Sequence, residues 1–154
     1  MLVIGIGNPY RGDDAVGFLV AQRVRERAPD GVTVLQCPGE GVALMEAWKG
    51  ADAVILVDAV HAGKAPGSVY RLDAHEGPIP ANFFHYSTHA FSVAEAVELA
   101  RALNQLPSRL VIYGIEGRDF EAGGELSHEV AKAAQRVVER VLKDIDSFQH
   151  GMPL

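Results

Sequence analysis

Short apolar runs alternate with longer amphipathic stretches along this chain, and the alternation constrains its fold more than any other feature of the sequence. Apolar runs predict buried strands, and apolar residues at helical spacing predict helices. We expect strands at 2–6, 32–35, 53–57, 67–72 and 109–115. We expect helices at 14–27 and 42–48, from a cap at Ser87 or Thr88 to 103, and from a cap at Ser127 to 145. Strands that alternate with helices predict an α/β fold, here a three-layer α/β/α sandwich with a mostly parallel sheet of about five strands.

Length and composition fit one globular domain. A chain of 154 residues is short for two domains, and its 48% hydrophobic and 22% charged residues are ordinary values. We assign 1–148 to a single domain and expect 149–154 to form a flexible tail.

The net charge of −6 argues against nucleic acid as a partner, because such binding depends on lysine and arginine neutralising phosphates. The apolar runs are far shorter than the roughly 20 residues that span a membrane, and the N-terminus lacks a signal-peptide pattern. We therefore expect a cytoplasmic protein that binds no membrane. The single cysteine, Cys37, has no base beside it and is interpreted as a small hydrophobic residue rather than a nucleophile.

The segment 5–14 reads GIGNPYRGDD and joins the first strand to the first helix. A dinucleotide fingerprint would need glycine where this chain has Tyr10, and acidic residues at the start of a helix repel a pyrophosphate. A nucleotide-binding module is therefore a disfavoured alternative. Asp13 is expected to cap the first helix.

Three polar residues are candidates for chemistry. Asp58 follows the most apolar run, where α/β sheets bind ligands, although an aspartate there can also cap a turn. His89 opens a predicted helix, where it can equally cap or pack, and His61 and His85 are rivals for its role. With Asp14, these residues supply two carboxylates and an imidazole that suit a divalent metal with open positions. The residues alone indicate a metal-linked hydrolase.

The same segments resemble a known family. Residues 5–17 (GIGNPYRGDDAVG) resemble the N-terminal signature of the hydrogenase maturation proteases, and 54–59 (VILVDA) resemble the family's apolar strand ending in aspartate. Residues 87–89 (STH), 111–116 (VIYGIE) and 126–127 (LS) are similar to its later segments, so the resemblance covers nearly the whole chain in order.

The resemblance implies an endopeptidase that removes the C-terminal extension from the large-subunit precursor of a nickel–iron hydrogenase. It implies that Asp14, Asp58 and His89 contact nickel already carried by the substrate, so the enzyme needs no tightly bound cofactor of its own. Some family members have glutamate at the position of Asp14. Catalysis is then of the aspartic type, with Asp14 or Asp58 as general base, or it is assisted by the metal.

Substrate binding is expected at Asn8 and at the turn formed by Gly39, Glu40 and Gly41. This turn resembles the family's glycine-rich turn only loosely, because family members often have threonine where this chain has Glu40. The loops 73–86 and 116–125 are expected to hold the partner protein. Phe83 and Phe84 are interpreted either as anchors for that partner or as core residues.

Two further alternatives keep the same residues. A nickel-checking or metal-binding maturation chaperone would bind the precursor without cutting it. A different peptidase on this fold would cut a substrate that carries no metal.

Overall fold

The computed structural model describes residues 1–80, 83–84 and 92–151. Its centre is one five-stranded sheet in the order β2-β1-β3-β5-β4. β4 is antiparallel to β5, and the other neighbouring strands are parallel, so the sheet is mostly parallel as predicted. The strands are β1 (Leu2–Ile6), β2 (Thr33–Cys37), β3 (Ala53–Val60), β4 (Val69–Asp73) and β5 (Arg109–Glu116).

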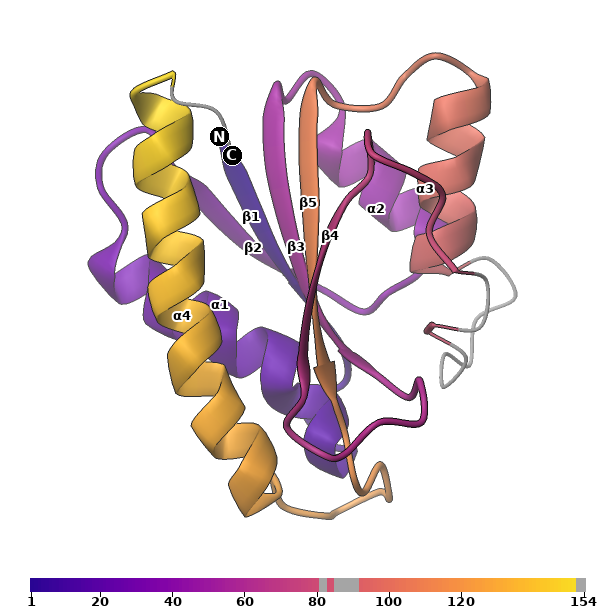
Figure 1. Cartoon of the computed structure of the whole chain (residues 1–154), viewed down its shortest axis with the longest axis vertical. Helices are drawn as coiled ribbons and strands as arrows, with labels where there is room; N and C mark the ends of the chain where they lie inside the picture. The colour runs from indigo at the N-terminus through magenta and orange to yellow at the C-terminus, as the bar shows by residue number, and fades with distance from the viewer. Residues whose placement is uncertain (81–82, 85–91, 152–154) are drawn as a thin grey trace.

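Helices cover both faces of this sheet (Figure 1). One layer pairs the first and last helices, and the other pairs the two helices between them. These elements are α1 (Val16–Arg27) with α4 (His128–Gln149), and α2 (Gly41–Trp48) with α3 (Val93–Ala102). A short 3-10 helix, η1 (Gly12–Ala15), precedes α1. The predicted three-layer sandwich is confirmed. None of the described helices is long and apolar enough to cross a membrane.

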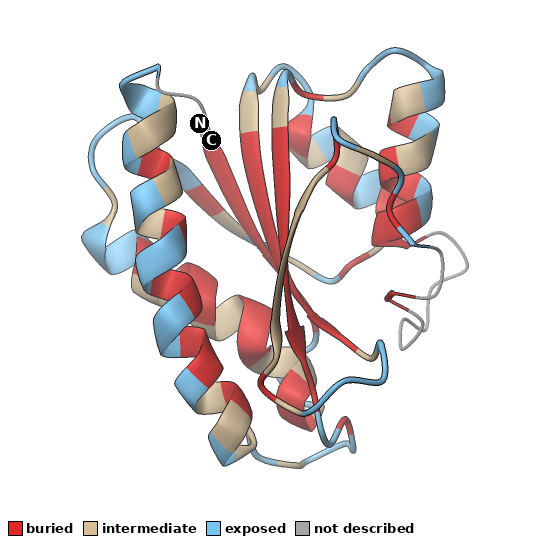
Figure 2. Cartoon of the chain, viewed as in Figure 1, coloured by how far each residue is buried: buried red, intermediate tan, exposed pale blue. Residues whose placement is uncertain are grey.

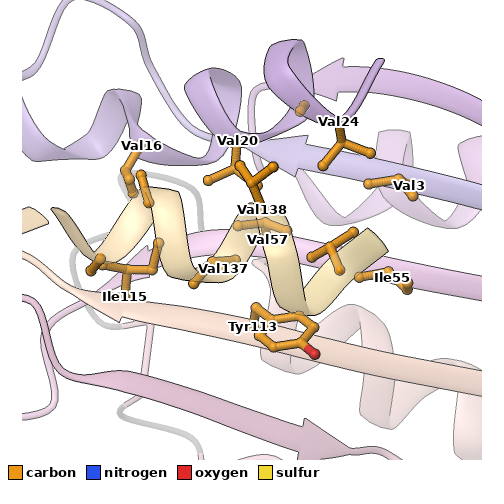
Figure 3. Packing of buried hydrophobic residues seen from close by; sticks show 14 of the residues in the cluster. Val3, Val16, Val20, Val24, Ile55, Val57, Tyr113, Ile115, Val137 and Val138 are labelled. Atoms are coloured by element: carbon orange, nitrogen blue, oxygen red, sulfur yellow. The ribbon is translucent and has the colours of Figure 1, made fainter. Parts of the chain in front are cut away.

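The sheet separates two hydrophobic cores, and β3 contributes to both. Ile55 and Val57 pack in the core beneath α1 and α4, whereas Val54 and Leu56 pack in the core beneath α2 and α3. This alternation follows from the two-residue period of a strand. The inner strands are buried along most of their length (Figure 2), and Figure 3 shows valines of α1 and α4 meeting the first core. The prediction of a central strand at 53–57 is confirmed.

β3 continues three residues beyond its predicted end. Its pairing with β1 stops at Gly5 opposite Val57, but its pairing with β5 runs on to Val60 opposite Glu116. Asp58 therefore lies inside β3, as the first residue of the strand that pairs with β5 but not with β1. The polar side chain of Asp58 predicted the end of the strand, because a sequence pattern does not show that pairing with one neighbouring strand continues after pairing with the other has stopped.

Two helix boundaries also differ from the prediction. The N-cap of α3 is Ser92 rather than Ser87 or Thr88, and the Glu95 carboxylate accepts the Ser92 backbone N–H at 3.2 Å and its hydroxyl. This capping box was readable as S-x-x-E in the sequence. α4 runs through Gln149, into the expected tail, where the Gln149 amide donates to the Asp30 carbonyl oxygen at 3.0 Å.

Candidate functional site

A cavity of about 500 Å³ opens at the carboxyl ends of β1 and β3. In Figure 1, these strand ends lie at the lower end of the sheet. Ligands of α/β sheets bind at this edge. Its walls are mostly apolar, and they include the side chains of Phe18, Phe84 and Phe120. Two carboxylates, Asp14 and Asp58, share this cavity, as the sequence predicted for the C-terminal side of the sheet.

The turn after β1 positions Asp14. Its Oδ2 atom accepts the backbone N–H of Asn8 at 2.9 Å, which closes the turn around the carboxylate. Gly7 has φ +149° and packs against the Asp14 backbone, where a side chain would collide. Burial raises the pKa of Asp14, although the Asn8 N–H and the charge of Arg11 act in the opposite direction.

β3 positions Asp58 deeper in the same cavity, where only 7% of the residue is exposed. Burial raises the pKa of Asp58 well above its ordinary value, and the negative charge of Asp14 raises it further. The backbone N–H of Ala59 opposes this shift with one hydrogen bond. Two carboxylates that feel each other's charge in a poorly solvated cavity favour either a shared proton or a bound cation.

His89, the third predicted member, lies outside the described residues, so the structure brings together two of the three. Within residues 1–80, 83–84 and 92–151, there is no cluster of three or more His, Cys, Asp or Glu side chains that could hold a metal. The rival His61 is not one of the described residues that line the cavity. It lies beside Glu116, with Nδ1 3.9 Å from Oε2, and its ring meets Phe120 edge-on at 5.8 Å. His85 also lies outside the described residues.

The residues predicted to bind substrate occupy different positions. Asn8 and Gly39 line the cavity, and the Asn8 Oδ1 atom accepts the Tyr10 N–H at 2.9 Å. Glu40 is the N-cap of α2, and Gly41 is the buried first residue of that helix. The Glu40 carboxylate accepts the backbone N–H groups of Val42 and Ala43, the second and third residues of α2, at 3.0 and 2.9 Å.

Phe83 and Phe84 are core residues, only 5% and 4% exposed, so the interpretation as partner anchors is wrong. Their rings meet edge-on at 5.0 Å, and Phe83 meets Tyr70 in the same way at 4.9 Å. Phe84 forms part of the cavity wall. Cys37 is half-buried, and burial raises the pKa of its thiol, which agrees with the non-nucleophilic interpretation.

The residue that sequence reasoning misjudged is Asp13. It does not cap α1, whose N-cap is Ala15. Instead it is fully buried, and its carboxylate accepts the backbone N–H groups of Arg118, Asp119 and Ser127 at 2.7, 3.0 and 2.6 Å. The Ser127 hydroxyl donates a fourth hydrogen bond at 2.8 Å. Asp13 thus ties the turn that carries Asp14 to the loop before α4, and its position beside Asp14 gave no sign of this different role.

Comparison with known proteins gives one consistent result. A family model described as hydrogenase maturation protease matches residues 19–144. The hydrogenase expression/formation protein HupD of Bradyrhizobium diazoefficiens is 31% identical over 133 residues, covering 84% of this chain and 69% of HupD. The Escherichia coli hydrogenase 2 maturation protease is 28% identical over 92% of this chain and 88% of its own length.

A solved structure agrees with these relatives. The [NiFe] hydrogenase maturation protease HycI from Thermococcus kodakarensis has a TM-score of 0.73 at 28% identity, covering 94% of this chain and 91% of that protein. The residues that match the family model include Asp58 and His89 and begin after Asp14. Because the family model spans well over half of the 154 residues, this chain belongs to the hydrogenase maturation proteases, a family of peptidases.

Proposed function

We propose that this protein is the endopeptidase that removes the C-terminal extension from the nickel-loaded large-subunit precursor of a nickel–iron hydrogenase. The observation that carries the proposal is the pair of carboxylates in one mostly apolar cavity, where burial and the charge of Asp14 together raise the pKa of Asp58. A cation brought by the substrate would relieve both the repulsion and the desolvation. We expect the protein to meet this precursor in the cytoplasm.

The nickel belongs to the substrate, and Asp14, Asp58 and His89 are proposed to recognise it there. Carboxylates and an imidazole bind nickel well, and three ligands leave coordination positions for the substrate's own groups. Recognition then depends on the difference in affinity between loaded and empty precursor. A discrimination of about a thousandfold needs about 4 kcal/mol from that contact. No resident cofactor is needed for this scheme.

Asp14 or Asp58 is proposed as the general base. A raised pKa brings a carboxylate nearer to neutral pH, where a general base works best. The carboxylate takes a proton from water, the oxygen attacks the scissile carbonyl carbon, and the C–N bond breaks as the proton passes to the leaving amine. The alternative for the same residues is that the substrate's metal polarises the carbonyl.

The peptide is proposed to pass the turn of Asn8 and Gly39 to Gly41. Because the carboxylate of Glu40 is already hydrogen-bonded to α2, we assign peptide contacts at this turn to backbone groups near Gly39. Asn8 retains its side-chain N–H donors for the substrate, since the described bond of that side chain uses only Oδ1.

The test is a cleavage assay on the purified large-subunit precursor, nickel-loaded and nickel-free, read by intact mass. Loss of a short C-terminal peptide from the loaded form alone is the expected result. Cleavage of both forms would retain the peptidase and remove the nickel check, and binding without cleavage of either would favour the chaperone.

The assay includes two site variants. Asp14→Asn and Asp58→Asn are expected to abolish cleavage, while Asp30→Asn, an exposed aspartate beside the opposite end of the sheet, serves as the matched control. Normal cleavage by Asp58→Asn would reject the assigned mechanism.

A further inference from the structure

Tyr10 is the most exposed large hydrophobic residue among those the structure describes, at 79%, and yet it lines the cavity that holds Asp14 and Asp58. Val42, Leu103 and Leu99 follow at 58%, 52% and 40%. Single exposed apolar residues are common on protein surfaces, but an aromatic ring at the mouth of a ligand-sized cavity is the kind of residue that dominates binding energies. Among the residues that the structure describes, Tyr10 belongs to neither hydrophobic core.

The backbone that carries the ring is fixed on both sides. The Tyr10 N–H donates to Asn8 Oδ1 at 2.9 Å, and the Tyr10 carbonyl oxygen accepts the Gly123 N–H at 2.8 Å. The buried carboxylate of Asp13 holds the loop that contains Gly123. Only the side-chain torsions of Tyr10 remain to be ordered on binding, so a contact with its ring has a small entropic cost.

The surroundings of Tyr10 define what the ring can bind. Pro9, Phe18, Phe84 and Phe120 line the same cavity as Tyr10. Because Tyr10 is exposed and lines this cavity, we expect a polypeptide whose scissile bond reaches Asp14 and Asp58 to pass beside its ring. The walls offer apolar surface, so the side chain that leaves along them is recognised by hydrophobic contact.

We propose that Tyr10 is a specificity-determining residue, whose ring packs against a hydrophobic side chain of the precursor next to the bond that is cleaved. This inference rests on the proposed function, because it takes the polypeptide substrate as the occupant of the cavity. Tyr10 then contributes to the choice of substrate sequence, and Asp14 and Asp58 carry out the cleavage.

The experiment measures the dissociation constant and the cleavage kinetics of the nickel-loaded precursor with Tyr10→Ala and Tyr10→Phe. Tyr10→Ala is expected to raise both Kd and KM about tenfold, as for an aromatic contact residue, with kcat and the thermal midpoint unchanged. Tyr10→Phe retains the ring and should behave as the wild type. Leu103→Ala, a similarly exposed residue at the end of α3, is the matched control and should change neither quantity.

A second measurement identifies the partner side chain. Once intact mass has located the cleaved bond, each hydrophobic residue beside it is replaced by alanine, and the effect is combined with Tyr10→Ala. One substrate variant should lose most of its own effect in the Tyr10→Ala background, because both changes remove the same contact.

The outcomes separate the inference from the proposed function. Unchanged Kd and KM for Tyr10→Ala, with normal wild-type cleavage, would overturn the inference alone. Equal losses for Tyr10→Ala and Tyr10→Phe would replace hydrophobic contact by hydrogen bonding from the hydroxyl group and also overturn it. Wild-type protein that binds the precursor without cutting it would overturn the proposed function, and a tenfold weaker Kd for Tyr10→Ala would still support the contact. Wild-type protein that does not bind would overturn both.

Discussion

Replacing Asp13 by alanine should destabilise the fold far more than replacing any exposed aspartate. The side chain is fully buried, and three backbone N–H groups and one hydroxyl lose their acceptor together. Each buried donor left without a partner costs about 1–3 kcal/mol. Arg118 and Asp119 have exposed side chains, so water reaches part of this site and the lower end of that range applies. We therefore expect Asp13→Ala to lower the free energy of unfolding by about 3–4 kcal/mol.

Asp13 has a second effect through α4. Ser127 is the N-cap of this helix, but its side chain makes no capping hydrogen bond and instead donates to Asp13. The Asp13 carboxylate therefore binds the N-cap residue of α4 and places negative charge near the positive end of the helix dipole. Asp13→Asn keeps the shape and one acceptor oxygen, but it turns an NH₂ group toward a donor, so we expect a loss of about 2 kcal/mol.

The assay is urea unfolding followed by circular dichroism, with Asp30→Asn as the exposed control, which should stay within about 0.5 kcal/mol of the wild type. A natural domain has only about 5–15 kcal/mol of stability, so the predicted loss is easily measured. The reasoning is refuted if Asp13→Ala costs less than about 1 kcal/mol, or if it costs no more than Asp13→Asn.

Three further predictions concern other parts of the chain. Because burial raises the pKa of Asp58, the folded state favours its protonated form, and the stability that protonation confers is lost as pH rises through the raised pKa. Asp58→Asn should therefore stabilise the protein by about 1 kcal/mol at pH 8 in a chelating buffer, and this gain should shrink as pH falls and be absent below about pH 4, where an ordinary aspartate is protonated. An absent gain at pH 8 in thermal unfolding would contradict this. Gly17→Ala places a methyl group against the Ile6 carbonyl oxygen and should cost at least about 2 kcal/mol by urea unfolding, whereas Gly77→Ala, which meets nothing within 4 Å, should not. Glu40→Ala removes the cap of α2 and should lower the free energy of unfolding by about 1 kcal/mol, which calorimetry would detect. Glu40→Ser supplies a new cap and should recover this stability.

The sequence predicted the parts of the fold that depend on repeated local patterns. Residues 53–57 form the centre of the sheet because an apolar run of this length has to be buried on both faces, and β3 is flanked by β1 and β5. Asp14 and Asp58 were predicted at the same edge of the sheet because the carboxyl ends of parallel strands meet there, and the structure places both in one cavity. These predictions need only periodicity and the rules of sheet topology.

The errors lie where a residue's role depends on a distant segment. Asp13 binds backbone groups more than 100 residues away in the sequence, and no local pattern distinguishes it from Asp14. The end of β3 depends on how far β5 continues beside it. The start of α3 is different, because the Ser92 and Glu95 pair is visible in the sequence, while Ser87 and Thr88 offer the same N-cap residue types earlier in the chain. The burial of Phe83 and Phe84 depends on the space beside Tyr70, which composition does not reveal.

The position of β3 between β1 and β5 has a consequence for the life of the nascent chain. β2 follows β1 in the sequence but lies outside it in the sheet, so the neighbours that bring Asp14 and Asp58 together are not successive strands. The loop that Asp13 holds comes later still, after β5. A partly synthesised chain therefore lacks the loop that Asp13 binds, and we expect the turn carrying Asp14 to take its final position beside Asp58 only in molecules that have completed the sheet. Such long-range assembly slows folding, because distant segments have to meet before their contacts can stabilise the chain.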